Sequence, residues 1–200
     1  MKFSLNSFIY KHVIDRILSR GQKSVIARLK PSDRVLDVAC GTGSLSISMS
    51  GVASYVRGID LSEEMIDIAK YAASKKRLSN VEFSISDASK LSMFNDNTFD
   101  IAVTSMAVHQ FDPDLAVQIL KEMKRIARRI IIMDYYYPMP VGIYRLVIFI
   151  VEWIAGGDHF RNFRKFNKLE GLSYYISEAG FSGQGNDLYK SNFFRVLECP

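Results

Sequence analysis

The sequence predicts an α/β fold: a doubly wound, mostly parallel sheet of about seven strands with helices on both faces and a C-terminal antiparallel hairpin. Two observations carry this prediction. Apolar strand-like segments alternate with amphipathic helical segments, which is typical of parallel sheets. Several of the apolar segments also end in a carboxylate or a glycine, and ligands bind to such sheets beyond the carboxyl ends of the strands.

The first elements follow from local signals. Residues 3–29 carry apolar side chains at helical spacing, interrupted at Gly21 and closed by Pro31. Residues 34–39 are mostly apolar and predict a strand buried on both faces. A short helix is expected after it, up to about Met49.

The next elements repeat this alternation. A second strand is expected over residues 52–60, and Ser62 is the expected N-cap of a helix that extends to the basic residues 75–77. Residues 81–86 alternate as a strand, and residues 99–105 form another buried strand.

The C-terminal part completes the sheet. Pro113 opens a helix to about residue 127, and residues 130–133 are the fifth strand. A helix is expected over residues 168–179, closed by Gly180. Residues 182–198 are expected to form two antiparallel strands.

Size and composition fit a single domain. The chain has 200 residues, of which 48% are hydrophobic and 24% charged. Within the domain 1–200 we expect an N-terminal helical cap over 1–30 and an apolar and basic substrate-side insert over 136–168. The net charge of +5 permits anionic partners without requiring them. Because Cys40 lies in a glycine turn, a disulfide with Cys199 is not expected. We therefore expect a reducing, cytoplasmic location.

Polar groups follow three of the strands. A carboxylate such as Asp37 is costly in a buried strand unless something pairs with it, and Gly41 and Gly43 allow a sharp turn close to a ligand. Asp60 ends the next strand, where a ribose-binding carboxylate belongs. Asp87-Ala88 follows the third strand, where a carboxylate and an N–H group would read an adenine edge. The alternatives are a tight turn, a helix-capping carboxylate and a solvated turn aspartate.

Together these motifs resemble a known family. Residues 37–43 (Asp-Val-Ala-Cys-Gly-Thr-Gly), Asp60-Leu61-Ser62, Asp87-Ala88 and Phe99-Asp100 resemble the class I S-adenosylmethionine-dependent methyltransferases over about residues 30–135. Within that family the chain resembles the branch of small-molecule enzymes that is similar to the quinone-biosynthesis C-methyltransferases. The resemblance implies a Rossmann-like sheet, S-adenosyl-L-methionine as the cofactor and methyl transfer to a small, hydrophobic acceptor.

The resemblance also implies a role for each matched position. Asp37 and the Gly41 backbone would face the methionine part of the cofactor. Asp60 would hold the ribose hydroxyls, Leu61 would pack on the adenine, and residues 104–106 would border the sulfonium. Met65 would cover the ribose–adenine face or pack in the core. The positions implied to bind the cofactor are Asp37, Ala39, Gly41, Thr42, Gly43, Asp60, Leu61, Met65, Asp87, Ala88, Thr104 and Met106.

Methyl transfer needs a general base only if the nucleophile arrives protonated, because the sulfonium is already activated. His109, just past the fourth strand, is the candidate catalytic base, and the alternative is a histidine that walls the pocket. Asp134 and Tyr135 are weaker candidates, and Tyr10 would close the site or pack in the N-terminal helix. The histidines are scattered without metal-ligand spacing, so no metal is expected.

The segment 143–155 is apolar except for Arg145 and Glu152, which would share one helical face. It is too short for an ordinary membrane span. It could be a core helix, cap an apolar pocket, meet a partner chain or lie in a membrane surface. Residues 160–166 interleave aromatic and basic side chains, which fits lipid headgroups, nucleic acid or an amphipathic helix with a solvated basic face. We expect a lipid-like substrate and peripheral membrane contact through 143–166.

Other functions are less favoured. An RNA methyltransferase is permitted by the net charge and the basic residues of 160–168, but no catalytic motif of that class is visible, so nucleic acid is not an expected partner. A dehydrogenase would place a third glycine where Ser46 stands. A non-catalytic, cofactor-binding regulatory protein is the alternative outside enzymes, and the intact carboxylates and glycines argue against it.

Overall fold

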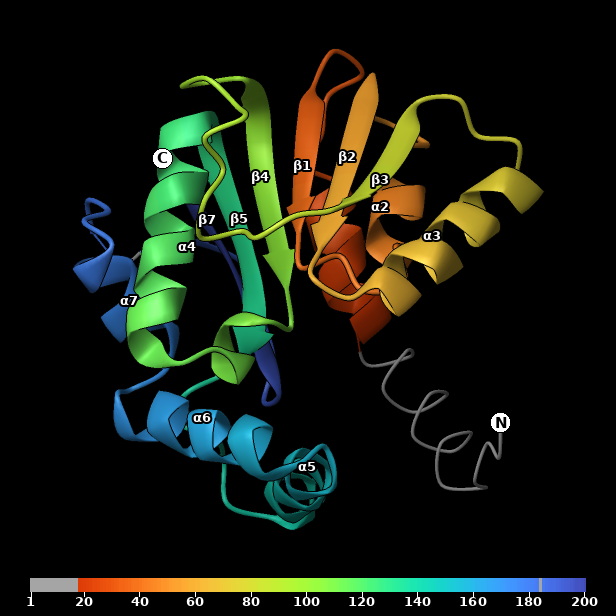
Figure 1. The fold of residues 1–200 in the computed structure, drawn as a ribbon. Helices are drawn as coiled ribbons and strands as arrows, with labels where there is room; N and C mark the ends of the chain where they lie inside the picture. The colour runs from red at the N-terminus through yellow and green to blue at the C-terminus, as the bar shows by residue number, and fades with distance from the viewer. Residues whose placement is uncertain (1–17, 184) are drawn as a thin grey trace.

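The computed structural model describes residues 18–183 and 185–200. One seven-stranded sheet has the strand order β3-β2-β1-β4-β5-β7-β6 (Figure 1). Strands β1 to β5 pair in parallel, and β7 is antiparallel to β5 and β6. The predicted fold class is therefore confirmed. The strands are β1 (Arg34–Val38), β2 (Tyr55–Asp60), β3 (Val81–Ile85), β4 (Phe99–Ser105), β5 (Ala127–Tyr135), β6 (Asn186–Lys190) and β7 (Phe194–Cys199).

Helices cover both faces of this sheet. The first described helix covers residues 18–26. The others are α2 (Ser44–Met49), α3 (Glu63–Lys75), the 3-10 helix η1 (Val108–Gln110), α4 (Pro113–Ile126), α5 (Ile143–Ile154), α6 (Gly157–Lys168) and α7 (Leu172–Glu178). One hydrophobic cluster joins helix 18–26, α2 and α3 to the sheet, and another joins α4, α6 and α7 to it. Because neighbouring strand residues such as Val35 and Leu36 belong to different clusters, the two clusters lie on opposite faces.

Capping side chains set two helix starts where the sequence signals them. The Ser62 hydroxyl accepts a hydrogen bond from the Met65 N–H at 3.3 Å, so Ser62 is the N-cap of α3, as predicted. The Asp112 carboxylate accepts from the Asp114 N–H at 3.3 Å and caps α4, which has Pro113 in its first turn. Both helices therefore begin directly after the carboxyl end of a strand or its loop and point their N-termini toward that end of the sheet.

Gly21 does not interrupt the first helix as the sequence suggests. It lies inside helix 18–26, and a Cβ at this position would lie 2.5 Å from the Phe194 ring and 2.8 Å from the Met133 sulfur. Gly21 is thus a packing glycine that lets the helix approach the sheet closely. The expected helical cap over residues 1–17, including Tyr10, lies outside the described residues.

Further boundaries differ from the predictions. The second strand begins at Tyr55 rather than at residue 52, and the first helix ends at residue 26 rather than 29. The fifth strand is longer than predicted because Arg129 lies in it and pairs with Glu198 of β7 at 2.9 Å, so its charge is compensated within the sheet. The last helix begins later than predicted, at Leu172. Glu170 and Gly171, both with positive φ, separate it from α6.

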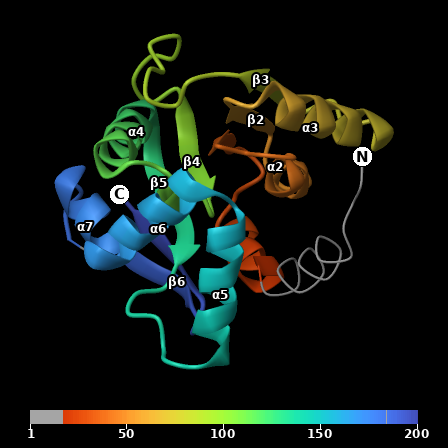
Figure 2. The same ribbon diagram turned by 60° about the horizontal axis from the view of Figure 1, so that its bottom comes forward.

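The helices α5 and α6 lie beyond the carboxyl ends of β4 and β5 (Figures 1 and 2). They lie between β5 and α7, within the segment 136–168 for which a substrate-side insert is expected. Among residues 18–183 and 185–200, no helix has the length and apolar character that crossing a membrane requires.

Candidate functional site

The strand order reverses between β1 and β4, and a cavity of about 450 Å³ opens at the carboxyl ends of the strands around this point. This is where open α/β sheets bind ligands. The volume lies within the range of about 300–1,000 Å³ that is usual for small-molecule pockets. The lining residues are Leu18, Gln22, Asp37, Ala39, Cys40, Gly41, Thr42, Ser44, Leu45, Asp60, Met65, Ser105, Met106, Ala107, Gln110 and Phe111.

Asp37 lies on β1 at the inner end of the cavity and is 1% exposed. Its carboxylate accepts a hydrogen bond of 2.5 Å from the Ser46 hydroxyl of α2. Burial raises the pKa of the Asp37 carboxyl to about 7, while the Ser46 hydrogen bond lowers it and the nearby charge of Asp60 raises it. A carboxyl group held in this way is poised to ionise when a cation enters the cavity.

Asp60, at the end of β2, bridges two backbone segments around the cavity. Its Oδ2 accepts from the Gly41 N–H at 2.8 Å, and its Oδ1 accepts from the Ser62 N–H at 2.9 Å. Each carboxylate oxygen has a further lone pair. Asp60 can therefore hold the glycine turn in place and still accept hydrogen bonds from a ligand hydroxyl.

The two glycines of the turn differ in their surroundings. Both have positive φ, 51° at Gly41 and 72° at Gly43. A Cβ at Gly41 would meet no atom within 4 Å, so its backbone borders open space in the cavity. A Cβ at Gly43 would lie 2.6 Å from the Phe83 ring and 2.8 Å from the Ala69 Cβ, so Gly43 serves close packing beneath the turn.

Two lining residues other than glycine adopt the left-handed backbone conformation. Ala39, after β1, and Met106, after β4, both have a φ of 56°. The Met106 N–H donates to the Met133 carbonyl at 2.7 Å, which fixes the turn after β4. Left-handed residues with a side chain cost about 1–3 kcal/mol and concentrate at functional sites. Their positions on the two strands that flank the cavity mark it as a site rather than a packing defect.

The cavity brings together seven of the residues predicted to bind the cofactor and leaves five outside its lining. Those in the lining are Asp37, Ala39, Gly41, Thr42, Asp60, Met65 and Met106. Those outside it are Gly43, Leu61, Asp87, Ala88 and Thr104. The roles of all twelve stay predictions.

The five outside the lining have different surroundings. Leu61, next to Asp60, is 67% exposed, which leaves an apolar surface beside the cavity. The Ser86 N–H donates to the Asp60 carbonyl at 3.0 Å and ties the segment of Asp87 to β2. The Asp87 carboxylate accepts from the Ser89 hydroxyl at 2.7 Å, which holds its pKa below the usual value. Thr104 is buried, and its hydroxyl has no hydrogen-bond partner within the described part of the chain.

His109 does not line the cavity. It lies in η1, is 2% exposed, and its Nδ1 is 2.6 Å from the Asp134 carboxylate. Its Nε2 is 3.6 Å from the Glu152 carboxylate. Burial lowers the pKa of His109, but the charges and hydrogen bond of these carboxylates outweigh burial and raise it. The role as general base stays a prediction, and the position of the ring among carboxylates does not favour it.

Several residues in the cavity lining or next to it are not identified as site residues from the sequence. Ser46 stabilises Asp37, and Gln22 and Gln110 are polar side chains in the lining. Ser46 stands at the third glycine position of the dinucleotide fingerprint, and that departure was its signal. Gln22 and Phe111 carry no signal, because only the folded chain brings helix 18–26 and η1 to the strand ends.

Comparisons with known proteins agree with this geometry. Residues 35–129 match a family model described as a methyltransferase domain. A demethylmenaquinone methyltransferase from Bacillus mycoides (strain KBAB4) is 30% identical over 154 residues, which cover 72% of this chain and 64% of that protein. The uncharacterized methyltransferase YcgJ from Bacillus subtilis (strain 168) is 28% identical over 141 residues, 68% of this chain and 54% of that protein. The chain therefore spans less than two thirds of these two relatives.

The fold has solved counterparts. The crystal structure of a SAM-dependent methyltransferase from Aquifex aeolicus matches with a TM-score of 0.66 at 22% sequence identity. The match covers 89% of this chain and 88% of that protein. At this level of identity the likeness concerns the fold.

The different surroundings of the two glycines predict different costs of an added methyl group. Gly41→Ala adds backbone strain of about 1–2 kcal/mol with no clash. Gly43→Ala adds similar strain plus overpacking against Phe83 and Ala69, which costs about a further 1–3 kcal/mol. Urea unfolding of both variants should give a lower free energy of unfolding for Gly43→Ala by at least ~1 kcal/mol. Equal losses would contradict the packing role of Gly43.

Proposed function

Because the chain belongs to the class I S-adenosylmethionine-dependent methyltransferases, we propose that it transfers a methyl group from S-adenosylmethionine to a small, hydrophobic acceptor. The observation that carries the proposal is the cavity at the strand reversal, with the Asp37 and Asp60 carboxylates in its lining. A dinucleotide site would have no use for a buried carboxylate at the position of Asp37.

The two free cysteines, Cys40 and Cys199, support a reducing, cytoplasmic location.

The residues present fit this cofactor. Open space faces Gly41, so a ligand can approach the turn closely. Asp37 offers a carboxylate to the cationic methionine end, and Asp60 offers free lone pairs to the ribose hydroxyls. Leu61 offers an exposed apolar surface to the adenine. The cavity therefore provides partners for the charged, the polar and the aromatic parts of the cofactor.

S-adenosylmethionine supplies a methyl group that is already activated on a sulfonium. The task of the protein is then to align the acceptor with that methyl group and to exclude water. Met106, Gln110 and Phe111, from the turn after β4 and from η1 and its end, line the cavity on the side nearest the insert. We assign the acceptor to this side.

The character of the insert supports a hydrophobic acceptor. Six apolar residues recur along one stripe of α5 at helical spacing and are between 45% and 67% exposed. They are Ile143, Leu146, Val147, Ile150, Trp153 and Ile154. The opposite side of α5 faces inward with Ile148 and Glu152. The name of the Bacillus mycoides relative, a demethylmenaquinone methyltransferase, likewise supports a small-molecule acceptor.

In the folded chain, the aromatic and basic residues of 160–168 do not support an RNA methyltransferase. Phe163 and Phe166 of α6 are fully buried and Phe160 is half-buried, so these aromatic side chains are not available to stack on bases. The exposed side of α6 carries basic residues such as Arg161 and Arg164. Helix α6 is therefore amphipathic, with aromatic side chains on its inner side and basic residues on its exposed side.

Replacing Asp60 by alanine tests the cofactor site. Hydrogen bonds to a charged group contribute about 1.5–3 kcal/mol each, so Asp60→Ala should weaken binding of S-adenosylhomocysteine at least ~10-fold. Calorimetry measures the affinity, and transfer of labelled methyl into organic-extractable quinones and lipids measures the activity. Glu63→Ala, on the exposed first turn of α3, is the control and should bind normally. Unchanged affinity in Asp60→Ala would remove the ribose role, and binding without transfer to any acceptor would favour a regulatory protein.

We further propose that the exposed stripe of α5 rests on an anionic membrane surface and receives a lipid-like acceptor there. The stripe is apolar, and Arg161 and Arg164 are exposed on the neighbouring helix α6, which complements acidic headgroups. Because Trp153 is the single tryptophan of the chain and lies in the stripe, its emission reports on this contact directly.

Liposomes with anionic lipids should shift the Trp153 emission to the blue, and uncharged liposomes should do so less. Ile150→Glu should weaken liposome binding about 10-fold, because it places a charge in the apolar stripe that the membrane would bury. Ile68→Glu, at a similarly exposed position of α3, is the matched control and should bind like the parent chain. An unchanged emission, or equal effects of both substitutions, would contradict the membrane contact.

A further inference from the structure

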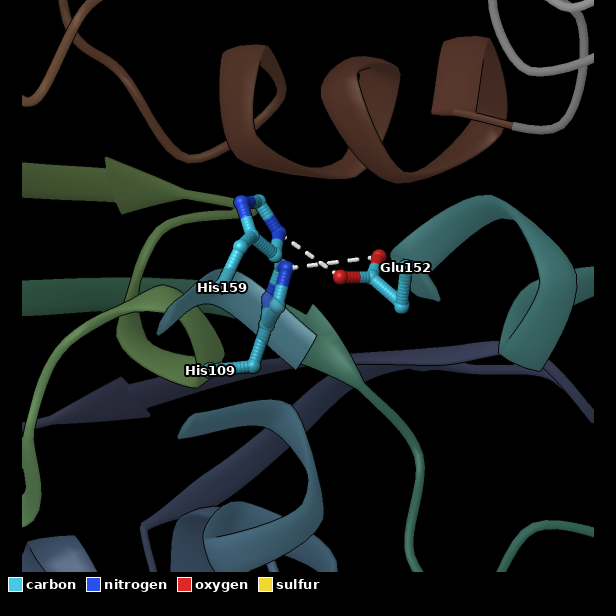
Figure 3. A group of neighbouring side chains, drawn as sticks. All are labelled: His109, Glu152 and His159. Carbon is cyan, nitrogen blue, oxygen red and sulfur yellow. Dashed lines mark ion pairs between the residues drawn. The ribbon is translucent and has the colours of Figure 1, made fainter. Parts of the chain in front are cut away.

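A second cluster of chemistry-bearing side chains lies outside the cofactor cavity. His109 of η1, Glu152 of α5 and His159 of α6 point toward one another (Figure 3). His109 Nε2 is 3.6 Å from Glu152 Oε1, and His159 Nε2 is 2.7 Å from Glu152 Oε2. None of the three lines the cavity. Methyl transfer as proposed above leaves this cluster without a function.

Burial of these polar side chains is energetically unfavourable unless a ligand or a full set of hydrogen-bond and charge partners compensates it. Glu152 is 3% exposed and His109 is 2% exposed, whereas the side chain of His159 is 25% exposed and gives access from solvent. His159 Nε2 and Glu152 Oε2 lie at ion-pair distance, and no conventional hydrogen bond to Oε2 is present within the described chain.

Neighbouring groups orient the cluster in the way that protein metal sites are supported. Asp134 Oδ1 lies 2.6 Å from His109 Nδ1, which places the Nε2 lone pair of that ring toward Glu152. The Tyr135 hydroxyl donates to Glu152 Oε1 at 2.6 Å. Metal-binding histidines usually direct their other ring nitrogen at a carboxylate, and metal-binding carboxylates are themselves hydrogen-bonded.

The spacing of the atoms fits a small divalent ion. One ligand atom from each of the three residues lies within 4.8 Å of the other two. Zinc bonds of about 2.0–2.2 Å in tetrahedral geometry place ligand atoms about 3.3–3.6 Å apart. The 3.6 Å between His109 Nε2 and Glu152 Oε1 matches this spacing, whereas His159 Nε2 lies 2.7 Å from the other oxygen, Oε2. Binding one ion would therefore require the Glu152 carboxylate and the His159 ring to readjust around it.

We propose that His109, Glu152 and His159 bind a divalent transition-metal ion, with Zn²⁺ as the best match to the ligand set. Two imidazoles and one carboxylate suit zinc, whereas Mg²⁺ and Ca²⁺ require mostly oxygen ligands. Three protein ligands leave the fourth tetrahedral position to water.

The ion would tie three separate elements together. Asn162 of α6 already donates to the Gln110 carbonyl at 2.8 Å, and Gln110 lines the cofactor cavity. Bound metal would hold α5 and α6 against η1 and so fix the rim of the cavity on the side of the insert. The inference therefore predicts a gain in thermal stability on metal binding, because an ion that binds only the folded chain stabilises it.

Metal binding is tested on the full chain, produced without a histidine tag and stripped with a chelator. Titration with Co²⁺ should give the visible bands of tetrahedral Co²⁺ and saturate at one equivalent, and Zn²⁺ should displace it and raise the melting temperature. Glu152→Gln removes the charge at constant size and should lower Zn²⁺ affinity at least ~100-fold.

His159→Asn covers the case that Glu152→Gln does not fold, because His159 is partly exposed. It should lose the Co²⁺ bands while it keeps its affinity for S-adenosylhomocysteine, so failure of the metal site is distinguished from failure of the methyltransferase proposal. Asp158→Asn is the matched control, a neighbouring carboxylate that is 86% exposed, and should bind the metal normally. The inference is overturned if the parent chain binds no Co²⁺ or Zn²⁺, or if His159→Asn and Asp158→Asn bind equally.

Discussion

The reversal of strand order between β1 and β4 is the constraint on which the site depends. At this point the connections leave β1 and β4 toward opposite faces of the sheet, which leaves a crevice between their carboxyl ends. The residues after both strands, Ala39 and Met106, take the left-handed conformation there and turn the chain away from the crevice. The cavity, its two carboxylates and its glycine turn are consequences of this one topological feature.

Within this crevice the energetic cost of burying Asp37 is only partly compensated. A carboxylate buried to this degree is unfavourable, and the Ser46 hydroxyl and the mixed environment of the cavity only partly offset the cost. The Asp37 carboxylate thus lies where a cationic ligand would compensate its burial. Asp60 differs, because its oxygens already accept two backbone N–H groups and organise the turn before any ligand arrives.

The sequence predicted what depends on local pattern and on topology. Asp37, Gly41 and Asp60 each follow a recognisable strand, and the parallel arrangement alone brings their ends to one edge. Gly21 was misjudged because a glycine that breaks a helix and a glycine that allows close packing look alike until Phe194 and Met133 are in place. Gln22 and Phe111 depend on contacts between elements and could not be found from spacing. Ser46 departs from the glycine pattern, but only the fold shows its contact with Asp37.

The helices α5 and α6 likewise depend on contacts between elements that the sequence does not show. The apolar run in α5 predicts an unusual helix, but only the fold shows that Ile148 and Glu152 face inward while the stripe with Trp153 faces solvent. His109 and His159 are far apart in the sequence, so no motif could reveal that η1 and α6 place both rings beside Glu152. The arrangement of the insert is therefore determined by tertiary packing rather than by a local signature.

A crystal structure of the full chain with S-adenosylhomocysteine tests the central claim most directly. The account predicts the ligand in the cavity between β1 and β4, its ribose hydroxyls within hydrogen-bond distance of Asp60 and its adenine against Leu61. Its sulfur should face Met106 and the insert. An empty cavity at saturating ligand, or a ligand bound elsewhere on the chain, would contradict the account.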